Sequence, residues 1–331
     1  MSETPHGALE RLAEHGRRGF PHLIAARRRT EVDLADVQRR LAGIPLDPGA
    51  SVVLMGSWGR HERTSGSDDD FLVLVEGDRR EVRPRVEDLN RVLGHGEAKP
   101  GAQQTFGAQV FVEPLVRHIG LDDDSNRNLT RRMLLVLESL PVVGTEAYRD
   151  AFTRVVDGYV AGHAKDFRPP RFLLNDLIRY WRTICVDFAG KAREEEHKWG
   201  VRNAKLRLNR KLLFAGGLVP VLLCHEHRAD HQQSFLVEQL QAPPTDRLAA
   251  AFLRFDAADS GVRALGAYDR WIGMLDDPGT RAHLTALTRS RAADDPVFRD
   301  VRRLAKEFEQ GLLALLFETR LSPLVREFGV F

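Results

Sequence analysis

The chain has 331 residues, of which 43% are apolar and 29% are charged, with a formal net charge of +2. This length allows two domains with a sizeable core, and the balanced charge argues against a nucleic-acid binder that is basic over its whole surface. With only two cysteines, no apolar run of about 18 residues and a polar N-terminus, we expect a cytoplasmic protein without disulfides, membrane contacts or a secretory signal.

The first part of the chain alternates helical and strand patterns. Apolar residues at helical spacing predict helices at 1–43, 81–93 and 128–140. Short apolar runs predict buried strands at 52–55, 70–75 and 109–113. We expect Pro84 to lie in the first turn of its helix, where its missing N–H costs little, and Pro114 to end the third strand.

From about residue 146 onward the strand signals disappear. Helical spacing continues at 172–188, 201–214, 235–240, 245–253 and 301–317. The predicted fold class is therefore α+β, with a small mixed-sheet domain followed by an all-helical domain. The predicted boundaries are a helical segment at 1–45, the sheet domain at 46–145 and the helical domain at 146–331.

The segment between the first two predicted strands carries residues suited to a metal and a phosphate. Asp68 and Asp70 are two positions apart at the start of a strand, so both carboxylates point to one face and Asp69 points to the other. Two adjacent carboxylates repel each other unless a cation such as Mg²⁺ or Mn²⁺ lies between them. Gly56 lets the backbone approach a phosphate closely, and the Ser57 hydroxyl can bind its oxygens. A polar loop with helix-capping aspartates is the alternative, but the spacing between two apolar strands favours the site.

These residues resemble the DNA polymerase β-like nucleotidyltransferase superfamily, whose signature is a Gly-Ser turn followed by Asp-x-Asp at the start of an apolar strand. Ser57 precedes Asp68 by eleven positions, and Ser67 completes the frequent Ser-Asp-x-Asp form. Arg60 stands where many members have arginine, whereas His61 replaces a glycine that is often found there. The resemblance covers residues 50–115, about a fifth of the chain.

This resemblance implies a reaction and roles for the residues. NMP would be transferred from an NTP to an acceptor hydroxyl or phosphate, with release of pyrophosphate. Asp68 and Asp70 would bind Mg²⁺, and Gly56 and Ser57 would hold the terminal phosphates. Arg60 would belong to the nucleotide-binding residues and support the loop or its charge.

Members of the superfamily usually add a third carboxylate from a later strand. Glu113, at the end of the otherwise apolar strand 109–113, is the candidate for binding the metal and assisting the attacking hydroxyl. An exposed edge residue before a proline is the alternative. Three rivals occur in a pattern more typical of a loop or helix cap, namely Asp122, Asp123 and Asp124.

Cations cluster at 198–211, and no acidic residue occurs between Glu196 and Glu226. We expect Lys205 and Arg210 to contact the triphosphate or a polyanionic acceptor, although a solvated basic face is the alternative. On a regular α-helix these two residues would lie on different faces.

The sequence leaves several acceptors open. They are RNA (including tRNA) or protein, a small molecule such as an aminoglycoside-type antibiotic, and a second nucleotide. The basic stretch at 198–211 favours RNA slightly. The alternative from another class is a nucleotide-binding sensor or scaffold without turnover.

Overall fold

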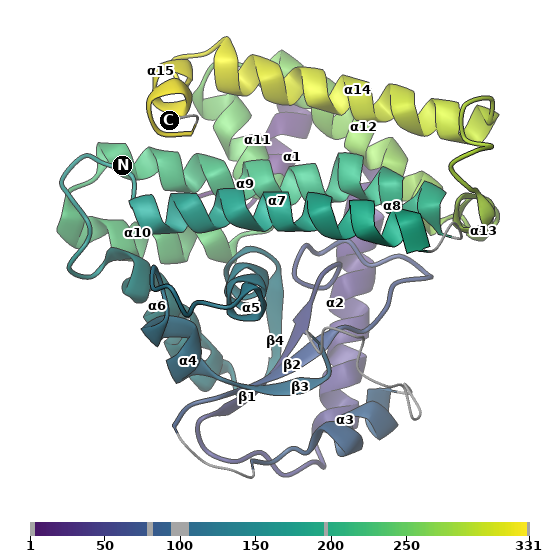
Figure 1. Ribbon diagram of the computed structural model, residues 1–331. Coiled ribbons are helices and arrows are strands. Elements are labelled where there is room, and N and C mark those ends of the chain that lie inside the picture. The colour runs from purple at the N-terminus through teal and green to yellow at the C-terminus, as the bar shows by residue number, and fades with distance from the viewer. Residues whose placement is uncertain (1–3, 78–81, 94–105, 195–197, 330–331) are drawn as a thin grey trace.

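The computed structural model describes residues 4–77, 82–93, 106–194 and 198–329. Within these ranges four strands form one mixed sheet in the order β3-β2-β1-β4. The strands are β1 (Ala50–Met55), β2 (Phe71–Val75), β3 (Ala108–Phe111) and β4 (Ser139–Val143). β1 is antiparallel to both β2 and β4, whereas β3 is parallel to β2. The α+β fold class is therefore confirmed (Figure 1).

The strands at 52–55 and 70–75 are confirmed, but the third strand is shorter than predicted. β3 ends at Phe111, and α4 (Val112–Arg117) begins directly after it. Pro114 lies in the first turn of this helix, where proline is tolerated, so it does not end a strand. β4 was not predicted, because it is a short edge strand that contains Pro141 and directly follows α5 (Asn126–Leu137).

Both faces of the sheet are covered by helices. On one face, α2 (Pro21–Leu41) and α3 (Val86–Leu93) pack against alternate residues of β1 and β2, including Val52, Leu54 and Val73. α3 begins after Pro84, so the prediction that Pro84 lies in its first turn was wrong. The opposite face carries Val53, Met55 and Leu72 and contributes to the main core with α4, α5 and α6 (Thr145–Val160).

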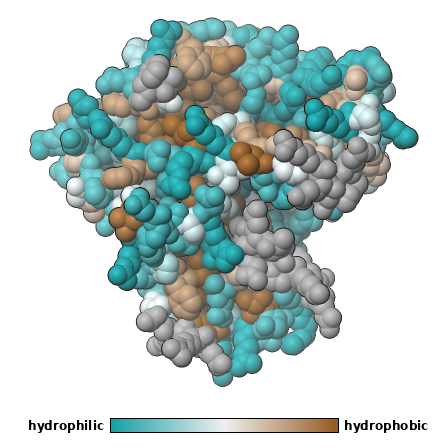
Figure 2. All heavy atoms as spheres, viewed as in Figure 1, coloured by the Kyte–Doolittle hydropathy of each residue, from teal (hydrophilic) through white to brown (hydrophobic). Residues whose placement is uncertain are grey.

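All described elements after β4 are helical, as predicted. The longer ones are α7 (Arg171–Glu194), α9 (Lys211–Leu223), α10 (Ala229–Gln241), α11 (Pro244–Arg254), α12 (Ala258–Asp276) and α14 (Pro296–Phe317). They stack in layers beside the sheet, and their buried side chains join the same core as one face of the sheet (Figure 1). The space-filling view shows a largely hydrophilic face that is broad over the helices and narrow over the sheet (Figure 2). In the described residues no helix is long and apolar enough to cross a membrane.

The N-terminal helices connect the two parts of the fold. α1 (Ala8–His15) packs on α11, where the N–H of Leu9 donates to the carboxylate of Asp246 at 3.3 Å. α2 contacts α12 near its start and β4 near its end, and the N–H of Leu23 donates to Asp269 at 2.9 Å. α2 therefore runs from the helical layers to the sheet, and it borders the loop between β1 and β2.

Candidate functional site

β1 ends in a turn that favours glycine. Gly56 has φ of +68°, in the left-handed region that residues with a Cβ rarely adopt. Its N–H donates to the carbonyl of Glu138 at 3.2 Å, and its own carbonyl accepts from the N–H of Arg60 at 3.0 Å. The hydroxyl of half-buried Ser57 makes no hydrogen bond within the described residues. Residues 56–61 form turns, so no helix N-terminus adds its dipole here.

The structure places Asp70 beside this turn. A Cβ built on Gly56 would lie 3.9 Å from the Oδ2 of Asp70, and the backbone of Met55 donates to the Asp70 carbonyl at 2.8 Å. Asp69 points the other way, where it accepts from the Trp58 indole at 3.0 Å and pairs with Arg63. Asp69 thus anchors the loop and leaves Asp70 and Asp68 for other contacts.

The electrostatics of Asp70 fit a cation site. Burial, followed by the charge of Asp68, raises the pKa of Asp70 to about 6, while Arg210 and Lys205 act in the opposite direction. A divalent cation would relieve this repulsion, and carboxylate oxygens are the donors that Mg²⁺ prefers. The described residues contain no group of three or more acidic, histidine or cysteine side chains placed to hold a metal ion. Mg²⁺ at this pair would therefore take its remaining ligands from water and substrate phosphates.

A buried ionic network lies beneath the turn. Arg60 donates through Nε to Glu62 at 2.9 Å and also pairs with Glu138, which accepts from Arg210 at 2.6 Å. Burial of the Glu138 carboxyl opposes its ionisation, but the charges of Arg210 and Arg60 outweigh this effect and lower its pKa. Because the Arg60 guanidinium is turned toward these carboxylates, Arg60 holds the loop in place.

Helix α12 fixes the other side of this network. The Tyr268 hydroxyl donates to Glu62 at 2.8 Å and accepts from the Asn209 amide at 2.8 Å. The Trp271 indole donates to the Asn209 carbonyl oxygen at 2.8 Å. These contacts join the loop after β1 to two helices of the helical layers, and no local pattern in the sequence predicts them.

Two cations lie near the loop that leads to Asp68. Burial, followed by the charge of Arg281, lowers the pKa of Lys205 to about 8, and the charge of Asp68 opposes this shift. Arg281, on α13 (Pro278–Ala286), donates to the Thr64 hydroxyl at 3.3 Å and lies directly over Gly66, where a Cβ would be 2.7 Å from its Nε. In the part of the chain that the structure describes, neither cation has a carboxylate within ion-pair distance.

Comparisons of the chain with protein-family models, with curated proteins and with solved structures found no match. The functional interpretation therefore rests on the residues of this site and on their geometry.

A π-helical segment brings the two predicted cations to the same site. Lys205 ends α8 (Trp199–Lys205), and Arg210 ends the π-helical η1 (Leu206–Arg210), which continues into α9. In a π-helix the hydrogen bonds join residues five apart, so side chains five positions apart lie close to one face. Both cations consequently act on the pKa of Asp70. The prediction of different faces assumed regular α-helical spacing, which the π-helical η1 interrupts between the two residues.

Glu113 does not reach the aspartates. It lies in the first turn of α4, exposed, and its carboxylate pairs with Arg154 at 2.8 Å. Arg154 also approaches Glu76, which follows β2, at 3.6 Å, whereas Asp70 precedes that strand. The five residues of β2 span roughly 16 Å. The prediction that Glu113 lies in a strand beside the aspartates was therefore wrong.

The three rival aspartates also lie elsewhere. Asp124 is buried against Arg132, Asp123 pairs with His118 at 2.9 Å, and Asp122 is exposed. Besides Asp68, the carboxylate that raises the pKa of Asp70 is Glu138, and this residue was not among the predicted candidates. Because both of its oxygens accept from arginines, Glu138 positions those arginines and does not serve as a free metal ligand.

Proposed function

We propose that this protein is a Mg²⁺-dependent nucleotidyltransferase that transfers NMP from an NTP to an acceptor hydroxyl or phosphate. The observation that carries the proposal is the position of the Asp70 carboxylate beside the Gly56 turn, with Asp68 next to it. The resemblance of the same residues to the DNA polymerase β-like superfamily supports this assignment. Lys205 and Arg281, which have no carboxylate partner in the described residues, add the positive charge that a triphosphate requires.

The residues have separable roles in this proposal. Asp68 and Asp70 would hold Mg²⁺, which when bound neutralises charge on the phosphates. Ser57 and the backbone of its turn bind phosphate oxygens, and Lys205 and Arg281 stabilise the departing pyrophosphate. The acceptor oxygen forms a bond to the α-phosphorus while the bond from that phosphorus to the bridging oxygen breaks, and the pyrophosphate keeps the electron pair. An acceptor hydroxyl releases its proton to water.

The positively charged side chains near the aspartates indicate which class of acceptor suits the site. Lys205 and Arg210 lie close enough to Asp70 to lower its pKa, and Arg281 lies close to Lys205, whereas an aminoglycoside carries several ammonium groups and requires an acidic pocket. We therefore favour an acceptor that itself carries phosphate, such as RNA or a second nucleotide. The two free thiols, Cys185 and Cys224, support a place in the reducing cytoplasm.

Transfer of label from an NTP to an acceptor tests this function. The purified protein is incubated with Mg²⁺ and each α-labelled NTP in turn, alone, with total RNA and with cell extract. We expect label in RNA or in a nucleotide product, and none with the Asp68→Asn/Asp70→Asn variant. Glu113→Gln removes a carboxylate that lies on α4, at the end of β2 away from Asp70, and this variant should keep full activity. NTP binding by the wild type without transfer under any condition would favour the sensor or scaffold alternative.

A further inference from the structure

A hollow lies on the opposite side of α12 from Glu62. It is formed by α12, α14 and the loop after α1, and its volume is about 590 Å³. Sites for small-molecule ligands typically measure about 300–1,000 Å³. The Tyr268 hydroxyl faces Glu62, whereas Arg270, two positions later, faces Glu307 on α14. This cavity is therefore separate from the aspartate pair.

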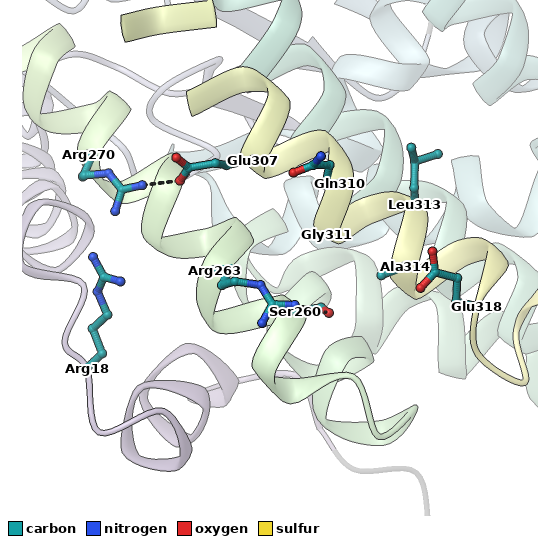
Figure 3. A pocket seen from close by; sticks show the side chains of 10 residues that line it. All are labelled: Arg18, Ser260, Arg263, Arg270, Glu307, Gln310, Gly311, Leu313, Ala314 and Glu318. Atoms are coloured by element: carbon teal, nitrogen blue, oxygen red, sulfur yellow. Dashed lines mark hydrogen bonds and ion pairs between the residues drawn. The ribbon is translucent and has the colours of Figure 1, made fainter. Parts of the chain in front are cut away.

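Three arginines line the cavity, and two of them have no carboxylate partner among the described residues. Arg270 pairs with Glu307, but Arg263 donates only to the Ser260 hydroxyl, at 3.0 Å. The guanidinium of Arg18 lies over Gly266 of α12, with its Cζ 3.8 Å from the position of a Cβ there. Across the described ranges neither Arg18 nor Arg263 has a carboxylate partner. Figure 3 shows Arg18, Arg263 and Arg270 along the same hollow.

The part of the cavity beside Glu318 has a different character. Leu313 and Ala314 provide apolar surface, and the carboxylate of Glu318 provides a hydrogen-bond acceptor. The floor is closely packed, because a Cβ on Gly311 would lie 2.5 Å from the Cβ of Ala264. A ligand that extends along the cavity would thus meet guanidinium groups first and then an apolar surface with an acceptor.

We propose that this cavity binds a small phosphomonoester through Arg18 and Arg263. A phosphomonoester carries a charge of about −1.5 to −2 at pH 7, which matches two uncompensated guanidinium groups, whereas a carboxylate would neutralise only one. Arginine also suits a phosphate because its planar fork donates two parallel hydrogen bonds. The apolar end with Glu318 suits the remainder of a nucleoside monophosphate or of a sugar phosphate, since both offer hydroxyl donors.

Calorimetric titration of the full chain in EDTA tests this site without metal at the aspartates. The probes are AMP, glucose 6-phosphate and inorganic phosphate, with adenosine and glucose as unphosphorylated counterparts. We expect one phosphorylated probe to bind once per chain and at least about tenfold more weakly to Arg18→Gln/Arg263→Gln. Both arginines are exposed, so this variant should fold normally, which circular dichroism verifies. Arg149→Gln/Arg171→Gln, an equal loss of exposed charge elsewhere, should bind like the wild type.

The outcomes separate the ligand classes. Tighter binding of AMP identifies a nucleotide site, and tighter binding of glucose 6-phosphate identifies a sugar-phosphate site. The proposal is overturned if no phosphorylated probe binds or if binding is unchanged in Arg18→Gln/Arg263→Gln. It is also overturned if adenosine and glucose bind as tightly as their phosphates.

Discussion

Glu138→Gln should reveal how strongly the ionic network holds the loop after β1. Glu138 is fully buried and pairs with both Arg60 and Arg210. Removal of one partner from a buried ion pair costs about 3–5 kcal/mol, because the other charge stays buried. Arg60 keeps Glu62 as a partner, and the side chain of Arg210 is 33% exposed and can turn partly toward water. We therefore expect a loss of about 2–3 kcal/mol in the free energy of unfolding.

Urea denaturation at pH 7, followed by circular dichroism, measures this loss. The matched control is Glu309→Gln, which removes one partner of the more exposed Lys211–Glu309 pair. The control should lose less than about 1 kcal/mol, as exposed pairs do. A loss in Glu138→Gln no larger than in the control would refute the view that this network stabilises the site.

Four further substitutions test the loop after β1 and the proposed nucleotide contacts. His61 has φ of +55° in a position typical of glycine, and burial lowers its pKa from 6.5 to about 4. The unfolded chain therefore binds more protons at His61 between these values, whereas the raised pKa of Asp70 acts in the opposite direction in both proteins. Between pH 8 and pH 5 the wild type should therefore lose about 2 kcal/mol more of its free energy of unfolding than His61→Gly does. Gly59→Ala would place a Cβ 2.0 Å from the backbone of Glu138 and should destabilise the fold by more than about 3 kcal/mol, measured by urea denaturation. Lys205→Gln and Arg281→Gln should each raise the KM for NTP about tenfold in a pyrophosphate-release assay.

Each of these changes has a control or a contradicting result. Equal acid sensitivity of the wild type and His61→Gly would show that His61 does not carry the pH dependence. Gly43→Ala, where a Cβ meets open space, should leave stability nearly unchanged. Arg207→Gln, which removes an exposed cation two positions after Lys205, should leave the KM unchanged. An equal rise in the KM in Arg207→Gln would mean that general positive charge, and not specific contacts, attracts the NTP.

The features that the sequence predicts well are short-range ones. β1, β2 and the positions of Asp68 and Asp70 follow from apolar runs and a period of two within one stretch of chain. The prediction for Glu113 failed at an element boundary, because Val112 and Pro114 fit the end of a strand and the start of a helix equally well.

The remaining features depend on contacts between distant segments. Glu138 meets Arg60 and Arg210, which are 78 and 72 positions away, and Arg281 meets Thr64 at a separation of 217. No local pattern marks such contacts, because they arise only when the helical layers pack on the sheet. The π-helical η1 likewise has no distinctive composition, although it decides which face carries Arg210.

The most direct test of the central claim compares NTP labelled at the α-phosphate with NTP labelled at the γ-phosphate, in the presence of Mg²⁺ and total RNA. A nucleotidyltransferase should move the α-label into an acceptor and the γ-label into pyrophosphate, and the Asp68→Asn/Asp70→Asn variant should move neither. Transfer of the γ-label to an acceptor, or undiminished α-label transfer by the variant, would contradict the proposed reaction at these aspartates.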